Sequence, residues 1–217
     1  MTAPAHTALL SSLPEARRAI LEHVKRQGES GVEPIAAALR VTISGARQQL
    51  VALERDGLLT HRQVREGAGR PRYLYALTAA GDALFPRRYA DLANELLEYV
   101  GDEDPALVAR IFERRGLRRL EGARQRMAGL PFAERVALIA RILDEDGYLA
   151  DFARNEDGTF VITEHNCAVL SVARRHGHAC SSELAFLQAA LPEAEVTRVA
   201  HQLVAGHICA YQIRPCV

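Results

Sequence analysis

The stretch VEPIAAALRVTISGARQQLVALERDGLLTHRQVREGAGRPRYLYALT (residues 32–78) determines the fold of the first part of this chain. Its pattern predicts a short helix over 33–39, a tight turn, a second helix over 44–56, and two strands over 58–64 and 72–77. The glycine-rich run EGAGRP between the strands predicts a turn. Two helices joined by a tight turn and followed by a β-hairpin form a winged helix-turn-helix arrangement.

The second of these helices has one apolar face and one polar face. Its apolar residues recur at helical spacing, which predicts that they face a core. They are Ile43, Ala46, Leu50 and Leu53. Small and polar residues gather near the N-terminal end, where a recognition helix contacts base edges. They are Gly45, Arg47, Gln48 and Gln49. Because arginine bonds guanine in bidentate fashion and glutamine reads adenine, this face predicts binding to double-stranded DNA.

Arginines also mark the predicted hairpin. Arg70 and Arg72 flank Pro71, and Arg62 lies on the adjoining strand, so a wing there would contact phosphate or the minor groove. Hydroxyl groups at the helix start are placed to contact phosphate. The full set of predicted DNA-binding residues is Thr42, Ser44, Arg47, Gln48, Gln49, Arg62, Arg70 and Arg72. The alternatives are a small three-helix fold with a merely solvated polar face, or a winged helix that binds protein.

Composition and charge exclude several classes of protein. Of 217 residues, 48% are hydrophobic and 25% charged, as in globular proteins. No apolar run approaches the roughly 18 residues of a membrane span, and the N-terminus lacks a signal-peptide pattern, so we expect a cytoplasmic protein without a membrane partner. Residues 1–90 hold 13 basic and 8 acidic side chains, whereas 91–217 hold 14 and 19. This asymmetry fits a DNA-binding part followed by a sensing or pairing part. No acid–base pair or phosphate loop indicates an enzyme.

The remaining patterns divide the chain into four parts and predict an α+β fold. A flexible tail (1–13) precedes the winged helix-turn-helix domain (14–85). Long amphipathic helices fill a dimerisation or linker region (86–146), with the best linker at 101–105. Two hairpins around two short helices form a small α+β sensor domain (147–217). A twofold homodimer of such a chain would match a palindromic operator.

All four cysteines lie in the last of these parts. They are Cys167, Cys180, Cys209 and Cys216. In a cytosolic protein such a cluster indicates metal or redox chemistry more than a disulfide framework, although a single cysteine is often only a small buried hydrophobe. The absence of a CxxC pair argues against a zinc ribbon. Cys167 and Cys180 are each expected to open a short helix, where the N-terminus favours the metal-binding thiolate form.

The run GRPRYLYALTAAGDALFPRRYADLANELLEYV (residues 69–100) resembles the wing and following helices of SufR-like winged-helix regulators, which are bacterial repressors of iron–sulfur cluster assembly genes. The stretches HNCAVLSVARRHGHACSSELAFLQ (165–188) and GHICAYQI (206–213) resemble the C-terminal blocks of the same family. The resemblance implies a homodimeric repressor on a palindromic operator. It also implies that an oxidation-sensitive iron–sulfur cluster, a [4Fe–4S] cluster, controls the affinity for DNA.

By this resemblance, the cluster ligands are Cys167, Cys180 and Cys209. Three cysteines leave one iron with a weaker partner, for which His201 is the candidate, with His207 and His165 as substitutes. Cys216 is expected to be a bystander. The remaining alternatives are a regulator that senses zinc or a small molecule through the C-terminal domain and, less favoured, a thiol or metal enzyme.

Two departures from the family pattern bear on this assignment. Ala168 stands where many relatives carry a proline directly after the first cysteine. The segment 199–206 lacks a cysteine that many relatives have before the glycine of the last turn. These departures leave three outcomes open for this chain: an altered cluster, zinc, or no metal.

Overall fold

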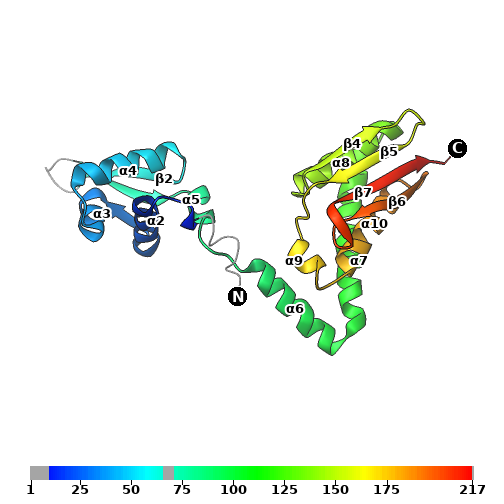
Figure 1. The fold of residues 1–217 in the computed structure, drawn as a ribbon, viewed down its shortest axis with the longest axis horizontal. Coiled ribbons are helices and arrows are strands. Elements are labelled where there is room, and N and C mark those ends of the chain that lie inside the picture. Colours follow the sequence, from blue (N-terminus) through cyan, green and yellow to red (C-terminus); the bar gives the residue numbers. More distant parts are fainter. Residues whose placement is uncertain (1–9, 66–70, 217) are drawn as a thin grey trace. The chain divides into compact units, whose positions relative to one another are not determined.

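The computed structural model describes residues 10–65 and 71–216. Arg70 and the first nine residues of the expected tail therefore lie outside the described residues. The chain divides into two compact units, residues 1–87 and 88–217, which are described separately (Figure 1). No helix within the described ranges is long and apolar enough to cross a membrane.

The first unit is a winged helix-turn-helix domain. Its elements are α2 (Glu15–Gln27), β1 (Glu29–Gly31), α3 (Val32–Leu39), α4 (Ile43–Arg55), β2 (Leu59–Val64), β3 (Arg72–Leu77) and α5 (Ala79–Ala83). The strands form an antiparallel sheet in the order β1-β3-β2, with β2 and β3 as the wing hairpin. The predicted helix pair and hairpin are confirmed. Strand β1 is an addition, because Glu-Ser-Gly carries no strand pattern of its own.

Local chemistry sets the turn between α3 and α4. Arg40 adopts a left-handed conformation (φ 55°) at the end of α3, and its backbone N–H donates to the carbonyls of Ala36 and Ala37. Thr42 caps α4, because its Oγ1 accepts a hydrogen bond from the backbone N–H of Gly45 at 3.1 Å. These contacts fix where α4, the recognition helix of this fold, begins.

Apolar side chains from the three main helices and the sheet form the core of the first unit. They include Ile20, Leu21, Val24, Ile35, Ala46, Leu50, Leu53 and Leu59. The expectation that Ile43 faces this core is wrong, since its side chain is 43% exposed. Ile43 is the first residue of α4 and lies beyond the packed part of that helix. Leu10 is buried in the same core, so the expected flexible tail does not include that residue.

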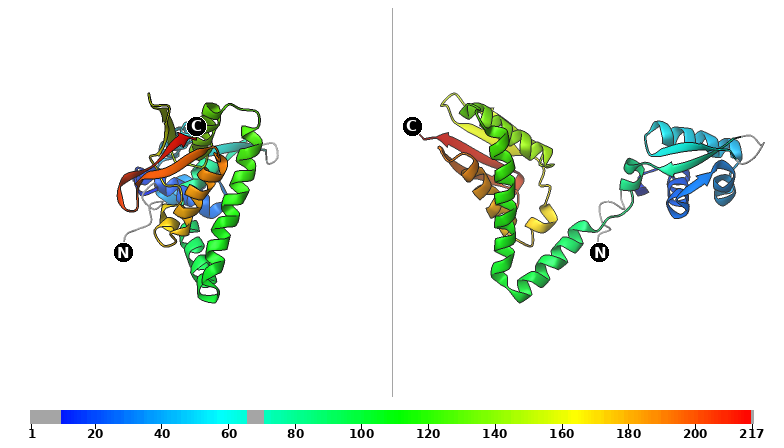
Figure 2. Two further views of the ribbon diagram at one scale, coloured as in Figure 1. Left: turned by 90° about the vertical axis from the view of Figure 1, so that its right-hand side faces the viewer. Right: turned by 180° about the vertical axis from the view of Figure 1, so that it is seen from behind.

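The second unit combines helices with a four-stranded sheet. Its elements are α6 (Tyr89–Glu103), α7 (Pro105–Met127), α8 (Phe132–Glu145), β4 (Ala150–Arg154), β5 (Phe160–Glu164), α9 (Leu170–Ala173), α10 (His178–Ala190), β6 (Ala194–His201) and β7 (Ala205–Pro215). The sheet is antiparallel in the order β4-β5-β7-β6. Figure 2 shows the sheet beside the long helix α7; α8 packs against β4 and β5, and α10 packs against α7 and β6.

One face of this sheet carries the buried residues of the second unit. Its inward side chains are Phe160, Ile162, Val196, Tyr211 and Ile213. They form a single cluster with residues of α7, α8 and α10, among them Leu120, Ile139, Leu143 and Leu187. The helices of 105–145 and the strands after 147 therefore share one core, although the sequence patterns place them in different regions.

The segment 101–105 is a corner between two helices of the second unit. Helix α6 continues to Glu103, Asp104 caps α7, and Pro105 is the first residue of α7. The Oδ1 atom of Asp104 accepts a hydrogen bond from the backbone N–H of Ala106 at 2.9 Å. The linker expectation for this segment is wrong, because proline at the first helical position starts a helix rather than separating two domains.

Candidate nucleic-acid interface and cysteine site

Helix α4 presents the predicted DNA-reading residues on its outer side. Ser44, Arg47 and Gln48 are exposed, and Gln49 is half-buried. The Thr42 hydroxyl is already an acceptor in the helix cap, so only its proton and remaining lone pair are left for a phosphate. The outer side of α4 therefore offers an arginine and a glutamine near its N-terminal end.

Exposed apolar residues, which were not among the predicted DNA-reading residues, lie on this same side of α4. Ile43, Arg47 and Val51 follow one another at four-residue spacing, which aligns them along the helix. Val51 is 61% exposed, and Val41 in the preceding turn is 43% exposed. Apolar side chains beside an arginine suit a major-groove surface, where they contact the methyl group of thymine. The four-residue spacing is the signal that could have identified them.

The wing arginines differ in their surroundings. The guanidinium of Arg62 donates two hydrogen bonds to the carboxylate of Glu29, at 2.8 Å and 2.6 Å. This pairing lowers the pKa of Glu29 and raises that of Arg62, so a phosphate would compete with the carboxylate for Arg62. Arg72 begins β3 opposite Val64 and is exposed.

Three of the four cysteines come together from separate elements of the second unit. Cys167 precedes α9, Cys180 lies in the first turn of α10, and Cys209 lies on β7. Cys167 is close enough to Cys180 and Cys209 for a negative charge on either to raise its pKa, and the same holds between Cys180 and Cys209. All three are thiols rather than disulfides. Cys216 is an exposed thiol beyond the end of β7.

Burial holds these three thiols in their protonated form. Burial raises the pKa of Cys167 to about 11, although a hydrogen bond from the backbone of Val169 opposes the rise. Burial also raises the pKa values of Cys180 and Cys209. The expectation that both cysteines open helices and favour the thiolate is wrong, because Cys167 precedes α9 and burial raises the pKa of both thiols. A metal that binds here must displace protons.

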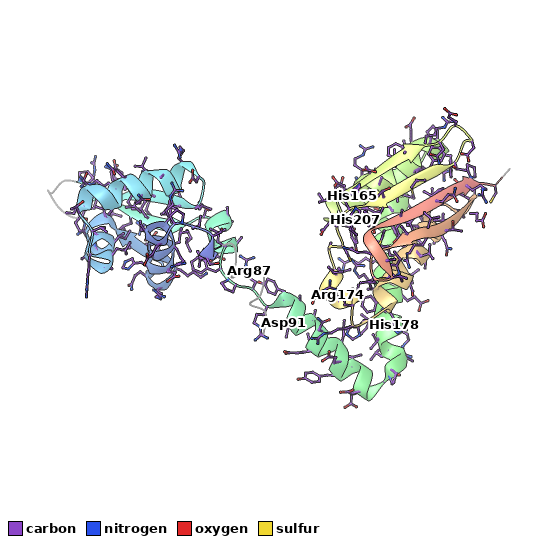
Figure 3. All side chains as sticks on the ribbon, viewed as in Figure 1. Arg87, Asp91, His165, Arg174, His178 and His207 are labelled. Carbon is purple, nitrogen blue, oxygen red and sulfur yellow. The ribbon has the colours of Figure 1, made fainter. Side chains whose placement is uncertain are left out.

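The histidines near these thiols are not equivalent. His165 bonds Asp151 at 2.9 Å, and the pairing of Glu164 with Cys209 puts His165 and His207, both labelled in Figure 3, at the same end of the sheet. The Nε2 atom of His201 is buried without a hydrogen-bond partner. Burial lowers the pKa of His201, which keeps the ring neutral and able to ligate a metal.

A single metal ion does not fit the side-chain positions as they stand. Within residues 10–65 and 71–216, no three His, Cys, Asp or Glu side chains are arranged to hold one ion. In a [4Fe–4S] cluster, by contrast, each cysteine bonds a different iron, so its thiolates need not converge on one point. The three thiols and the unpartnered Nε2 atom of His201 are therefore the groups that any metal centre here would have to use.

Buried charged groups that no sequence pattern predicted lie near the three cysteines. Glu183 bonds Tyr211 and Arg119, each at 3.5 Å. Burial, followed by the charge of Glu183, raises the pKa of Glu164 to about 9, and burial also raises the pKa of Glu183. Arg198 donates a hydrogen bond to the carbonyl of Cys180. No motif marks these groups, because strands and a helix far apart in the sequence bring them together.

An apolar groove of about 410 Å³ lies between α7 and α10. Phe112 and His178 line it and stack on each other, with ring centroids 6.5 Å apart. The groove is the feature that bears on the small-molecule alternative.

Comparison with protein families and with curated proteins found no match. Among solved structures, the chain is similar to Bacillus subtilis PadR in complex with operator DNA, at 19% identity over 54% of this chain and 78% of that one, with a TM-score of 0.30. It is similar to diamide-treated YodB from B. subtilis, at 18% identity over 48% and 96%, also with a TM-score of 0.30. A transcriptional regulator homologue from Pyrococcus horikoshii OT3 is 21% identical over 45% and 90%, with a TM-score of 0.30. The winged helix-turn-helix assignment rests on the elements of this chain itself.

Proposed function

We propose that the chain is a transcriptional regulator that binds a palindromic operator as a homodimer through α4 and the wing. The observation that carries this proposal is the outer side of α4, where Arg47 and Gln48 are exposed beside Val51. This combination of a guanine-reading, an adenine-reading and a methyl-contacting side chain is typical of a recognition helix. The net basic charge of the first 90 residues supports the same proposal.

DNA binding can be tested without knowing the operator. The protein is mixed with a library of random DNA duplexes, and the duplexes that it binds are selected and sequenced. We expect the full-length chain to enrich a twofold sequence. In Arg47→Ala and Gln48→Ala, affinity for that sequence should fall roughly tenfold or more, since a good base contact contributes about 1–3 kcal/mol. Arg55→Ala is the matched control, because Arg55 lies at the far end of the same helix beside Asp56. Failure to enrich any sequence would contradict the proposal.

We propose further that the second unit holds an oxidation-sensitive [4Fe–4S] cluster through Cys167, Cys180 and Cys209, with His201 as the fourth ligand. The gathering of the three thiols supports this assignment, and so does the buried, unpartnered Nε2 of His201. When bound, such a cluster supplies an iron–sulfur centre that oxidants can destroy. The protein's own contribution is to hold the ligands on three separate elements and to keep them partly out of water.

Anaerobic purification followed by iron and sulfide assays tests the cluster. We expect equal amounts of iron and sulfide, and their loss in Cys167→Ser, Cys180→Ser and Cys209→Ser. Cys216→Ser is the matched control and should keep the cluster, because that thiol is exposed and apart from the others. A protein that carries zinc and no sulfide would contradict the cluster and favour the zinc alternative.

The proposed regulation is repression that depends on the state of the cluster. It is tested by measuring affinity for the selected DNA before and after exposure to air. We expect the affinity to change in the wild type and to stay constant in Cys180→Ser, which lacks a proposed ligand. Equal affinity before and after loss of iron would contradict the sensing role and leave DNA binding in place.

A further inference from the structure

Helix α6 carries apolar side chains on two neighbouring faces. On its inner face, Leu97 and Val100 pack against the cluster that contains Val108 and Phe112. On the same side, the Asn94 amide donates to the Ser171 hydroxyl at 3.2 Å. The second face is the outer stripe, which consists of Tyr89, Leu92, Leu96 and Tyr99, with exposed fractions of 69%, 51%, 54% and 64%. A helix whose apolar residues extend this far around its surface is normally covered over that whole sector.

The outer stripe has the spacing of a helix-pairing surface. Its members are separated by three, four and three residues, which is the a/d repeat of a coiled-coil seam. The inner face is already occupied by α7 and α9 of the same unit, whereas the neighbouring outer stripe is exposed. The outer stripe is therefore shaped to receive one further helix along its length.

The order of residues in the outer stripe is the same from either end. It reads Tyr-Leu-Leu-Tyr about a centre at Asn94. An antiparallel pair of α6 helices would thus place Tyr89 against Tyr99 of the partner subunit and Leu92 against Leu96 of the partner subunit. Such a pairing is isologous, because a twofold axis through its centre exchanges the two copies. A stripe that complements itself in this way identifies a second copy of this chain as its occupant.

The charges along α6 favour the same antiparallel direction. Arg88 lies at the N-terminal end, whereas Asp102 and Glu103 lie at the C-terminal end. A parallel pair would place the acidic ends side by side. An antiparallel pair places Arg88 beside the acidic end of the other copy. It also orients the two helix dipoles in opposite directions, which is favourable. Arg88 is 73% exposed beside Asp91 in its own helix, so it is accessible to a second helix.

We propose that the outer stripe of α6 is the twofold homodimer interface of this protein, formed with the two helices antiparallel. The inference deepens the proposed function and rests on it to this extent: a twofold dimer is what recognition of a palindromic operator requires. The interface belongs entirely to the second unit, and its formation does not depend on DNA or on the cysteine site.

Sedimentation equilibrium of the full-length chain without DNA tests the interface. We expect a dimer for the wild type and at least a hundredfold weaker self-association for Leu92→Glu combined with Leu96→Glu. Leu117→Glu is the matched control, because Leu117 is a 59% exposed leucine on another helix of the same unit, and it should remain dimeric. Circular dichroism checks that each variant is folded. A monomeric wild type, or a folded double variant that stays dimeric, would overturn the proposal.

Disulfide trapping tests the antiparallel direction. Leu92→Cys and Leu96→Cys proteins are mixed, oxidised and digested, and the linked peptides are identified by mass. We expect links between position 92 of one copy and position 96 of the other. Predominant 92–92 and 96–96 links would overturn the antiparallel pairing. Selection of bound DNA with the same proteins separates the α6 interface from the proposed DNA binding. If the wild type enriches a specific sequence but dimerises through another surface, only the α6 interface is overturned.

Discussion

At the scale of single residues, Gly81 shows how closely the first unit is packed. A Cβ atom at this position would lie 2.1 Å from the carbonyl oxygen of Leu58. The backbone N–H of Gly81 also donates to the capping hydroxyl of Thr78 at 3.0 Å. Only glycine permits this approach of α5 to the start of β2.

Gly81→Ala should therefore destabilise the first unit by about 1–3 kcal/mol, as overpacking does. Gly122→Ala is the control within another helix. Nothing lies within 4 Å of an added Cβ there, so the change should stabilise that helix by roughly 0.5–1 kcal/mol. Calorimetric melting of both variants measures the difference. A Gly81→Ala protein as stable as the wild type would contradict the packing described.

Glu164 gives the second unit a pH-dependent stability. Its pKa is raised from 4.5 to about 9, so between these values the folded chain holds a proton that the unfolded chain has released. The stability from this group is complete below pH 4.5 and is lost as the pH rises toward about 9.

Glu164→Gln should flatten this loss between about pH 6 and pH 8 and raise stability at the upper end. Urea unfolding of chelator-treated protein at several pH values measures the slope. Glu156→Gln is the control, because Glu156 is exposed on the β4–β5 hairpin, and it should keep the wild-type slope. An unchanged slope in Glu164→Gln would rule out Glu164 as the source.

At the scale of elements, the corner between α6 and α7 depends on one side chain. Asp104 caps α7 and also pairs with Arg110 at 2.8 Å. Asp104→Ala should cost about 1 kcal/mol through loss of the cap. Asp104→Asn keeps an acceptor for the cap and loses only an exposed ion pair of small value, so it should stay near the wild type. Thermal unfolding distinguishes the two, and equal losses in both variants would assign the effect to the ion pair.

Elements were predictable where a local pattern was strong. The helix pair and the wing were found because apolar spacing changes from helical to alternating between α4 and β2. Strand β1 was missed, because its three residues become a strand only by pairing with β3. The polar residues on the outer side of α4 were predicted from the sequence. The apolar residues beside them were not, because helical spacing alone indicates that Ile43 faces the core.

At the scale of the whole molecule, the two units have separate hydrophobic cores. The clusters around Leu50 and around Leu143 have no member in common. A fragment of residues 88–217 should therefore fold alone, keep the thiol site and dimerise. A fragment of residues 1–87 should fold as a monomer. Circular dichroism and sedimentation of both fragments measure this, and an unfolded 88–217 fragment would contradict the division.

Local sequence patterns were enough to predict the helix pair and hairpin of the winged helix-turn-helix domain and to propose its DNA-reading residues. Each is a pattern within one or two neighbouring elements, so short-range spacing is enough to define it. Other features depend on how distant parts of the chain pack together. The tertiary structure brought Cys167, Cys180 and Cys209 together, and it placed Glu164 and Glu183 near them. It also raised the pKa values of the thiols that the sequence predicted to ionise readily. Those properties depend on burial and on contacts between residues far apart in the chain, which no local pattern records.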